Sequence, residues 1–280
     1  MIWTLYFIIL LIIGILIFFN IPYSKTKNNF HNDIDIYSNK FKLKTESITE
    51  QDIAHLPTLV QNYFRVCGYL GKTKMSSVRI DMPAASLQSS INKPPMKVSY
   101  TLWSFADEPV RLAYIKTSVF GIPFEVYDST QNGIGFMKGV MGKVVVLFNQ
   151  TGREMDKSQL LTYLAECFFI PSSMLSEYIT WKPISNTQVE ATINYKDLSA
   201  SGIFTFNDKG FIESFTTDDR TNIGTDGSVQ RVKWSAIYEN FSENPGIYFP
   251  NTIKAIWHYK DGDLVYFDAN KITVHYDDNI

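Results

Sequence analysis

The sequence predicts an α+β protein in which a large curved antiparallel β-sheet, a half-barrel meander of about ten strands, wraps around a helix. Three observations predict this architecture and a transmembrane helix before it. The first 19 residues are almost wholly apolar, the hydrophobic period changes from 3.6 to 2 near residue 74, and residues 157–169 form a strongly apolar helical stretch. An apolar content of 45% is enough for a sizeable core, and a net charge of −2 argues against a nucleic-acid partner.

The N-terminal segment "MIWTLYFIILLIIGILIFFN" predicts a membrane anchor over residues 1–20. About 20 apolar residues in a helix span a hydrocarbon layer of about 30 Å. The basic start, shorter apolar core and small-residue cleavage site of a signal peptide are missing, so we expect an uncleaved single-pass anchor. Lysines follow the span and none precedes it, which favours a cytoplasmic body, but one anchor before a large domain is a weak case for this rule. The side of the membrane stays open.

Residues 21–50 are polar and rich in Asn and Lys without sustained periodicity, which indicates a juxtamembrane linker. Residues 51–280 are then expected to form one soluble half-barrel domain with a helical lead-in. Ser47 and Glu50 fit a capping box, and Leu59, Val60, Tyr63, Phe64 and Cys67 follow at helical spacing.

From Lys74 onward, apolar and polar residues alternate as in strands with one covered face. "VKWSAIYENF" places Trp234 and Tyr238 on one face, and "IKAIWHYKDGDLVYF" aligns Trp257 with its apolar neighbours before a hairpin turn at Asp261-Gly262. A second hairpin turns through Asn207 to Gly210. Consecutive hairpins imply an antiparallel meander, whose concave face would hold the helix.

The expected helix in "LLTYLAECFFIPSSML" is apolar around most of its circumference. At about 100° per residue, Glu166 falls beside Thr162 and Gln159 in one narrow polar stripe. We therefore expect the stripe to meet water or a polar partner, and Pro171 to end the helix.

Motifs for phosphate binding, metal binding and nucleophilic catalysis are missing. "GYLGKT" has Val66 where a phosphate loop needs Gly, no histidines lie at metal-ligand spacing, and Gly-x-Ser-x-Gly does not occur. Cys67 and Cys167 are expected to be free buried thiols. The sequence thus predicts no cofactor, no metal and no catalytic residue, although Asp128 and Glu166 could run acid/base chemistry if the fold brings them together.

An ordered set of residues resembles an uncharacterised bacterial family of unknown function with an N-terminal membrane segment, of the DUF6544 type. The set covers nearly all of residues 55–278. It consists of Leu56-Pro57, Asp128, Gly133, Gly135, Tyr163-Leu164-Ala165-Glu166, Pro171, Leu175, Trp181, Arg220, Trp234, Pro250 and Trp257. Many members have Trp directly before the Pro of the helix motif, where this chain has Phe169-Ile170. The resemblance implies location in the bacterial inner membrane and a fold similar to the lipoprotein-carrier and lipid-carrier half-barrels, and it supplies no activity.

These observations lead to one main hypothesis and two alternatives. The main hypothesis is a membrane-anchored, non-enzymatic binding domain for a lipid, an acyl chain or a lipidated partner; the protein partner is unknown. The alternatives are a structural or protein-docking envelope protein, and a hydrolase-like enzyme that uses Asp128 and Glu166 on a hydrophobic substrate. The candidate pocket residues are Asp128, Tyr163, Glu166, Trp181, Arg220, Trp234 and Trp257, with Glu166 and Arg220 as a candidate ion pair.

Overall fold

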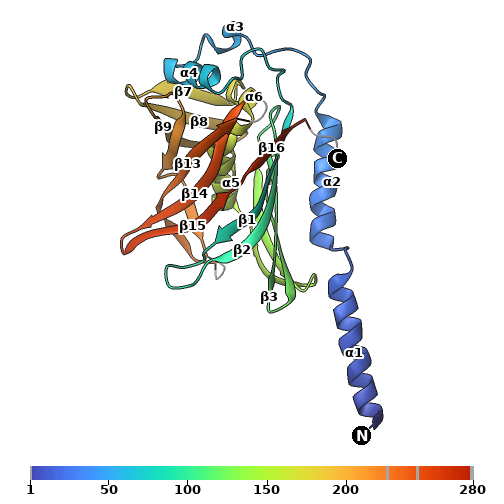
Figure 1. Cartoon of the computed structure of the whole chain (residues 1–280). Coiled ribbons are helices and arrows are strands. Elements are labelled where there is room, and N and C mark those ends of the chain that lie inside the picture. The colour runs from blue at the N-terminus through green and yellow to red at the C-terminus, as the bar shows by residue number, and fades with distance from the viewer. Residues whose placement is uncertain (1, 225–226, 244–245, 278–280) are drawn as a thin grey trace.

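The computed structural model describes residues 2–224, 227–243 and 246–277, and most of its strands join in one curved antiparallel sheet (Figure 1). The order in the sheet is β6-β5-β4-β3-β2-β1-β15-β14-β13-β10-β9-β8-β7, and β16 pairs with the first half of β1. The first half of the chain supplies β1 (Ser77–Leu87), β2 (Met96–Phe105), β3 (Val110–Val119), β4 (Ile122–Gln131), β5 (Ile134–Met141) and β6 (Val145–Gln150). The second half supplies β7 (Ile179–Pro183), β8 (Gln188–Tyr195), β9 (Leu198–Phe206), β10 (Ile212–Thr217), β13 (Lys233–Glu243), β14 (Tyr248–Tyr259), β15 (Gly262–Asn270) and β16 (Thr273–Tyr276). The predicted fold class is confirmed.

The described residues contain more strands than the ten or so expected. A small second sheet pairs β11 (Thr221–Ile223) with β12 (Val229–Arg231). Strand β5 is difficult to predict from the sequence, because it contains glycines, which are typical of turns. Gly135 and Gly139 lie inside this strand. Both positions need glycine, since a Cβ would come within 2.7 Å of the Met155 carbonyl oxygen at Gly135 and within 2.3 Å of the Phe148 ring at Gly139.

Helix α5 (Arg153–Glu166) lies within the curve of the sheet, as the sequence predicts (Figure 1). All its residues from Ser158 to Ala165 are buried, including the polar ones. The 3₁₀ turn η1 (Cys167–Phe169) ends it, and Pro171 begins the short helix α6 (Pro171–Met174), since proline suits the first turn of a helix. The rings of Phe168 and Tyr238 pack 4.6 Å apart, and the Tyr238 hydroxyl donates to the Ala165 carbonyl at 2.7 Å.

Helix α2 (Lys25–Lys40) lies in the segment that we expected to be a linker. Ser24 caps it, and Phe30, Ile34 and Tyr37 pack on the outer face of β2–β4. These apolar residues are spaced at four and three positions, a helical stripe that the many intervening Asn and Lys residues obscure. Part of the segment predicted to be a juxtamembrane linker over residues 21–50 is thus a packed helix. The division of the chain at residues 20 and 50 stays a prediction.

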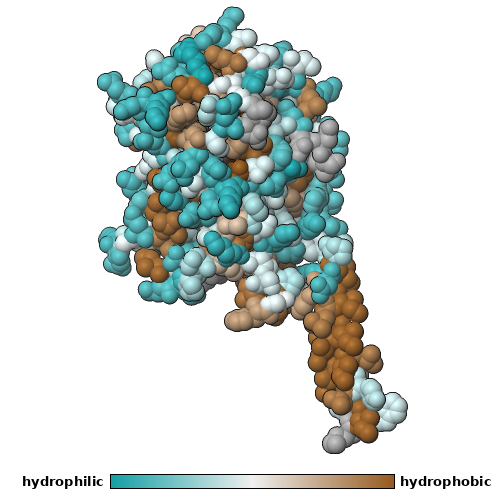
Figure 2. Space-filling view, viewed as in Figure 1, coloured by the Kyte–Doolittle hydropathy of each residue, from teal (hydrophilic) through white to brown (hydrophobic). Residues whose placement is uncertain are grey.

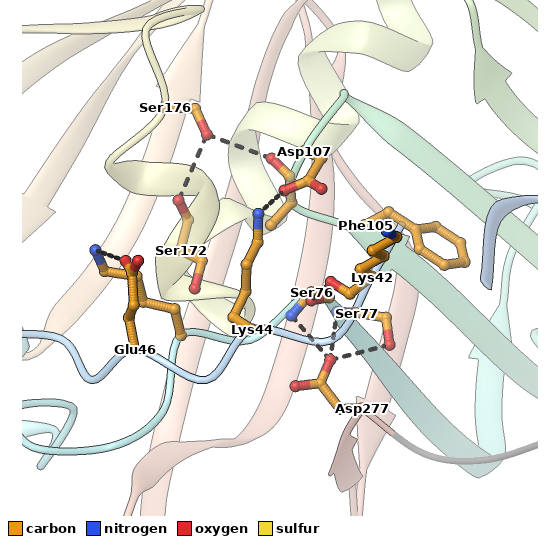
Figure 3. A network of polar contacts seen from close by, with 12 residues as sticks. Lys42, Lys44, Glu46, Ser76, Ser77, Phe105, Asp107, Ser172, Ser176 and Asp277 are labelled. Atoms are coloured by element: carbon orange, nitrogen blue, oxygen red, sulfur yellow. Dashed lines mark hydrogen bonds and ion pairs between the residues drawn. The ribbon is translucent and has the colours of Figure 1, made fainter. Parts of the chain in front are cut away.

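The chain after α2 is fixed by a network of polar contacts (Figure 3). The Ser76 hydroxyl donates to the Lys42 carbonyl at 2.8 Å, and Lys44 pairs with Asp107 at 2.5 Å. The amides of Ser76 and Ser77 both donate to the same carboxylate oxygen of Asp277 at 2.8 Å. The network joins the end of α2, the start of β1 and the end of the chain that the structure describes.

The helical lead-in consists of α3 (Glu50–Ile53) and α4 (Thr58–Val66). Val60, Tyr63 and Phe64 are buried as their spacing predicts. The capping box is formed by Thr49 and Asp52, not by Ser47 and Glu50. Thr49 and Asp52 have the same three-residue spacing, two positions later in the sequence. Ser47 is held in a β-bridge with Thr73 and therefore cannot begin the helix. Both cysteines are free and buried, as predicted.

Helix α1 (Ile2–Asn20) is the one described helix that is long and apolar enough to span a membrane, and it buries none of its residues against the domain. Figure 2 shows it as a continuous apolar surface that extends from a mostly hydrophilic body. Its last turn meets the β5–β6 turn, where the Lys143 ammonium donates to the carbonyls of Phe18 and Ile21 at 2.8 and 2.5 Å. We call this end of the half-barrel, with the β3–β4 and β5–β6 turns, the anchor end.

Candidate functional site

The centre of the concave face is a buried arginine that holds two carboxylates. Arg111, near the start of β3, is only 2% exposed. Its guanidinium donates to both oxygens of Glu166 at 2.6 and 3.2 Å, to Asp128 at 2.9 Å and to the Tyr100 hydroxyl at 2.5 Å. Sheet register and helix position together produce this cluster: Arg111 pairs with Thr130, two residues from Asp128 on the same face of β4, and Glu166 is the last residue of α5.

The electrostatics of the cluster favour the charged form of Arg111. Burial opposes the charge on Arg111, but the carboxylates of Glu166 and Asp128 and the Tyr100 hydroxyl hold its pKa well above the ordinary value. Burial raises the pKa of Tyr100, which therefore stays a neutral hydroxyl that accepts from Arg111. The second oxygen of Asp128 is buried and has no partner in the described structure. Glu166, with 22% of its side chain exposed, is the member of the cluster nearest to solvent.

A second arginine lies between aromatic rings on the other side of the polar stripe of α5. The Arg220 guanidinium carbon is 4.5 Å from the ring centroid of Trp234 on β13 and 5.5 Å from that of Trp257 on β14. One terminal nitrogen donates to the Thr162 hydroxyl, while the Nε–H is buried and finds no partner among the residues that the structure describes. Stacking of a guanidinium on indoles contributes about 1 kcal/mol per ring when partly desolvated.

The polar stripe of α5 therefore meets polar partners, as its position on the helix predicts. The candidate pair between Glu166 and Arg220 is not formed, because Arg111 already binds both carboxylate oxygens of Glu166. Arg220 binds Thr162, one turn earlier in the stripe. The stripe thus meets Arg111 from β3 at one point and Arg220, from the segment between β10 and β11, at another.

Two of the seven candidate residues lie elsewhere. The Tyr163 hydroxyl donates to the Phe105 carbonyl at 2.7 Å and contacts the Tyr178 hydroxyl at 2.8 Å, so it fastens α5 to the end of β2. Trp181 lies on the edge strand β7, packs near the Phe204 ring and donates to the Met174 carbonyl at 3.1 Å. Both side chains have structural contacts. The functional roles of all seven candidates stay predictions.

Sequence reasoning missed Arg111, the residue that organises the cluster. It lies in "VRLAYI", where Val110, Leu112 and Tyr114 pack on the outer face while Arg111, Ala113 and Ile115 face inward. A charged residue in a strand that is apolar on both faces needs a buried partner. That signal was present in the sequence, but the partners on β4 and α5 could not be read from it.

Apolar side chains on the concave face remain partly exposed between this cluster and the anchor end. They are Leu87, Met96, Phe124, Phe148 and Phe267, which we call the anchor-end surface. Tyr100 joins it to the charge cluster, because its ring packs edge-on to Phe267 at 5.4 Å while its hydroxyl binds Arg111. One concave face thus carries a packed charged region under α5 and an apolar region next to α1.

The outermost side chains at the anchor end are also apolar. Phe120 at the β3–β4 turn is fully exposed, and Val144 to Leu147 are each at least half exposed at the β5–β6 turn and along β6. A group of apolar side chains is visible at this end of the domain beside α1 (Figure 2). Exposed apolar groups that gather at one end are typical of surfaces that meet a partner or a membrane.

The chemistry available to the cluster is binding and positioning of charge. Asp128 and Glu166 both form ion pairs with the guanidinium of Arg111, which cannot be deprotonated in a protein. Among the described residues, His, Cys, Asp and Glu form no group of three or more suited to a metal ion.

Comparisons with solved structures returned distant likenesses. A LolA superfamily protein from Nitrosomonas europaea is 12% identical, with a TM-score of 0.44, and the match covers 84% of this chain and 96% of that one. A DUF1329 family protein from Desulfovibrio piger is 9% identical, with a TM-score of 0.42 and coverage of 84% and 95%. No curated protein matches the sequence.

The family model gives a firmer result. It matches residues 46–269, which include the strands from β1 to β14, all but the last residue of β15, the Arg111 cluster and the arginine between the two tryptophans. The match excludes α1 and α2. The ordered motif residues of the soluble domain all fall within this match. The chain belongs to the family of unknown function DUF6544.

Proposed function

We propose that the protein is a membrane-anchored, non-enzymatic domain that binds an acyl chain of a membrane lipid or of a lipidated protein. The anchor-end surface carries this proposal: apolar side chains of the concave face stay partly exposed at the end of the half-barrel that meets the last turn of α1. Helix α1 would hold that end of the domain against the bilayer, from which the domain would take up the acyl chain.

An acyl chain fits the chemistry of this surface. Burial of apolar area stabilises a complex by about 25 cal/mol per Å², and Phe124, Phe148 and Phe267 offer most of that area. At its inner limit the surface meets Tyr100 and the Arg111 cluster. An ester or carboxylate at the end of the chain would find polar groups there, which agrees with a ligand that is apolar along its length and polar at one end.

The test is binding of a fluorescent 16-carbon fatty acid to the full chain in a mild detergent. Phe124→Ser should weaken binding at least tenfold, because it removes a side chain whose burial contributes about 2 kcal/mol. Phe211→Ser is the matched control: Phe211 is equally a partly buried phenylalanine, but it lies just before β10 and packs against the rings of Phe241 and Tyr248. Equal binding by both variants, or no binding by the wild type, would refute the proposal.

A second candidate function, docking of a partner protein, has one observation in its favour. Strand β6 is an edge of the sheet and exposes Val145, Val146 and Leu147. Exposed edge strands are templates for an added strand of another chain. This candidate predicts that Val146→Lys abolishes photo-crosslinking from position 149 to a partner in cells and leaves fatty-acid binding unchanged; unchanged crosslinking would exclude it.

A further inference from the structure

We propose that a groove on the outer face of the domain binds the anionic headgroup of a phospholipid of the same bilayer. The groove has a volume of about 650 Å³ and lies between α2 and the outer faces of β5 and β6. It faces away from α5 and shares no residue with the anchor-end surface. The site is therefore separate from the proposed acyl-binding surface and does not depend on it.

The groove has an apolar floor and a cationic rim. Tyr127, Phe136 and Val140 belong to the floor, and Lys25, Lys138 and Lys143 contribute the positive charges. Three asparagines in the lining carry side-chain amides that can donate hydrogen bonds: Asn29, Asn32 and Asn149. This combination suits a ligand that carries a phosphate diester beside apolar groups.

The net charge of the side chains that line the groove is positive, even with its one acidic residue included. Asp33 also lines it, so three lysines face one carboxylate. One oxygen of Asp33 is already engaged, since it accepts from the Tyr127 hydroxyl at 2.5 Å and from Gln131 at 3.0 Å. Lys143 is held by the carbonyls at the end of α1, which leaves Lys25 and Lys138 as the cations best placed to bind a phosphate.

The position of the groove matches the depth of lipid headgroups. The 19 residues of α1 extend about 30 Å, the thickness of the hydrocarbon core, and the headgroup layer adds several ångströms beyond it. Lys143 contacts the carbonyl of Ile21, directly after the apolar helix, and Lys25 begins α2. The N-terminal end of α2 adds the positive end of a helix dipole to the rim.

The experiment is native mass spectrometry of the full chain in detergent, titrated with phosphatidylglycerol or phosphatidylcholine of identical acyl chains. The wild type should bind phosphatidylglycerol more tightly. The double variant Lys25→Gln/Lys138→Gln should lose about 20-fold in affinity for phosphatidylglycerol and nothing for phosphatidylcholine, since each lysine near an anionic surface contributes about fivefold.

Controls separate this site from general charge and from the acyl surface. Lys209→Gln/Lys260→Gln makes the same change in net charge at two exposed lysines outside the groove, and should leave both affinities unchanged. Fatty-acid binding should be unchanged in Lys25→Gln/Lys138→Gln, and selectivity for phosphatidylglycerol should be unchanged in Phe124→Ser. Equal wild-type affinities for the two lipids, equal losses in both double variants, or displacement of phosphatidylglycerol by millimolar inorganic phosphate would overturn the proposal.

Discussion

The two ends of the half-barrel are built differently from the same strands. At the end away from α1, α5 fills the concave face, and the Arg111 cluster and the arginine between the tryptophans satisfy its polar stripe. At the anchor end, the same face carries partly exposed apolar side chains, and the turns expose Phe120 and Val144. The first end is organised for stability and the second leaves apolar surface unburied. Function is therefore expected where stability is not maximised.

The largest expected effect concerns the charge cluster. Arg111→Met should lower the free energy of unfolding by about 3–5 kcal/mol, because it leaves Asp128 and Glu166 near each other without their cation. Urea unfolding of the full chain in a mild detergent measures it. Arg153→Met is the control, since its pair with Asp197 is exposed to solvent and should leave the free energy of unfolding nearly unchanged. Asp128→Asn and Glu166→Gln added to Arg111→Met should recover part of the loss; a further loss would give the carboxylates a role beyond binding Arg111.

The next prediction tests whether α2 is part of the folded body. Phe30→Ala should cost about 3 kcal/mol, because Phe30 is buried against the rings of Tyr114 and Tyr127, at 5.5 and 5.8 Å. Ile36→Ala on the exposed side of the same helix should change the free energy of unfolding by less than 0.5 kcal/mol. Urea unfolding of both variants measures the difference. If Phe30→Ala and Ile36→Ala both had small and equal effects on the free energy of unfolding, residues 25–40 would be a linker that does not stabilise the domain.

The third prediction concerns pH and the helical lead-in. Hydrogen bonds from Lys74 and Thr49 lower the pKa of Asp52 to about 2, below its ordinary value of 3.8. Because the folded-state pKa is depressed, the stabilisation is complete above about pH 4 and is lost as the pH falls toward 2. Asp52→Asn should cost about 1 kcal/mol at pH 7 and only a small part of that at pH 2, by urea unfolding at both values. If the loss of stability in Asp52→Asn does not change with pH, the contribution of Asp52 comes from packing and not from its charge.

Patterns in the sequence predicted those parts of the structure that depend on local order. Alternation indicated the meander, the Asp261-Gly262 dipeptide indicated a hairpin that the structure contains, and the helical position of Glu166 indicated its polar partners. The identity of those partners depends on register between distant strands. Arg111 meets Asp128 only because β3 and β4 pair Ala113 with Asp128, and no local pattern contains that register. Gly139 shows the same limit, since its role is space for the Phe148 ring of the next strand.

The smallest expected effect is at the anchor end. Phe120 is fully exposed and has a φ of 51°, a left-handed conformation that costs a residue with a bulky side chain about 1 kcal/mol. Phe120→Asn should therefore leave the free energy of unfolding unchanged or raise it by up to about 0.5 kcal/mol, since asparagine adopts this conformation more easily. If the variant also loses affinity for the fluorescent fatty acid, Phe120 contributes to uptake of the ligand at a site where it lowers stability. A destabilised variant would show instead that Phe120 is buried by a neighbour, and the anchor end would then be part of the packed body of the domain.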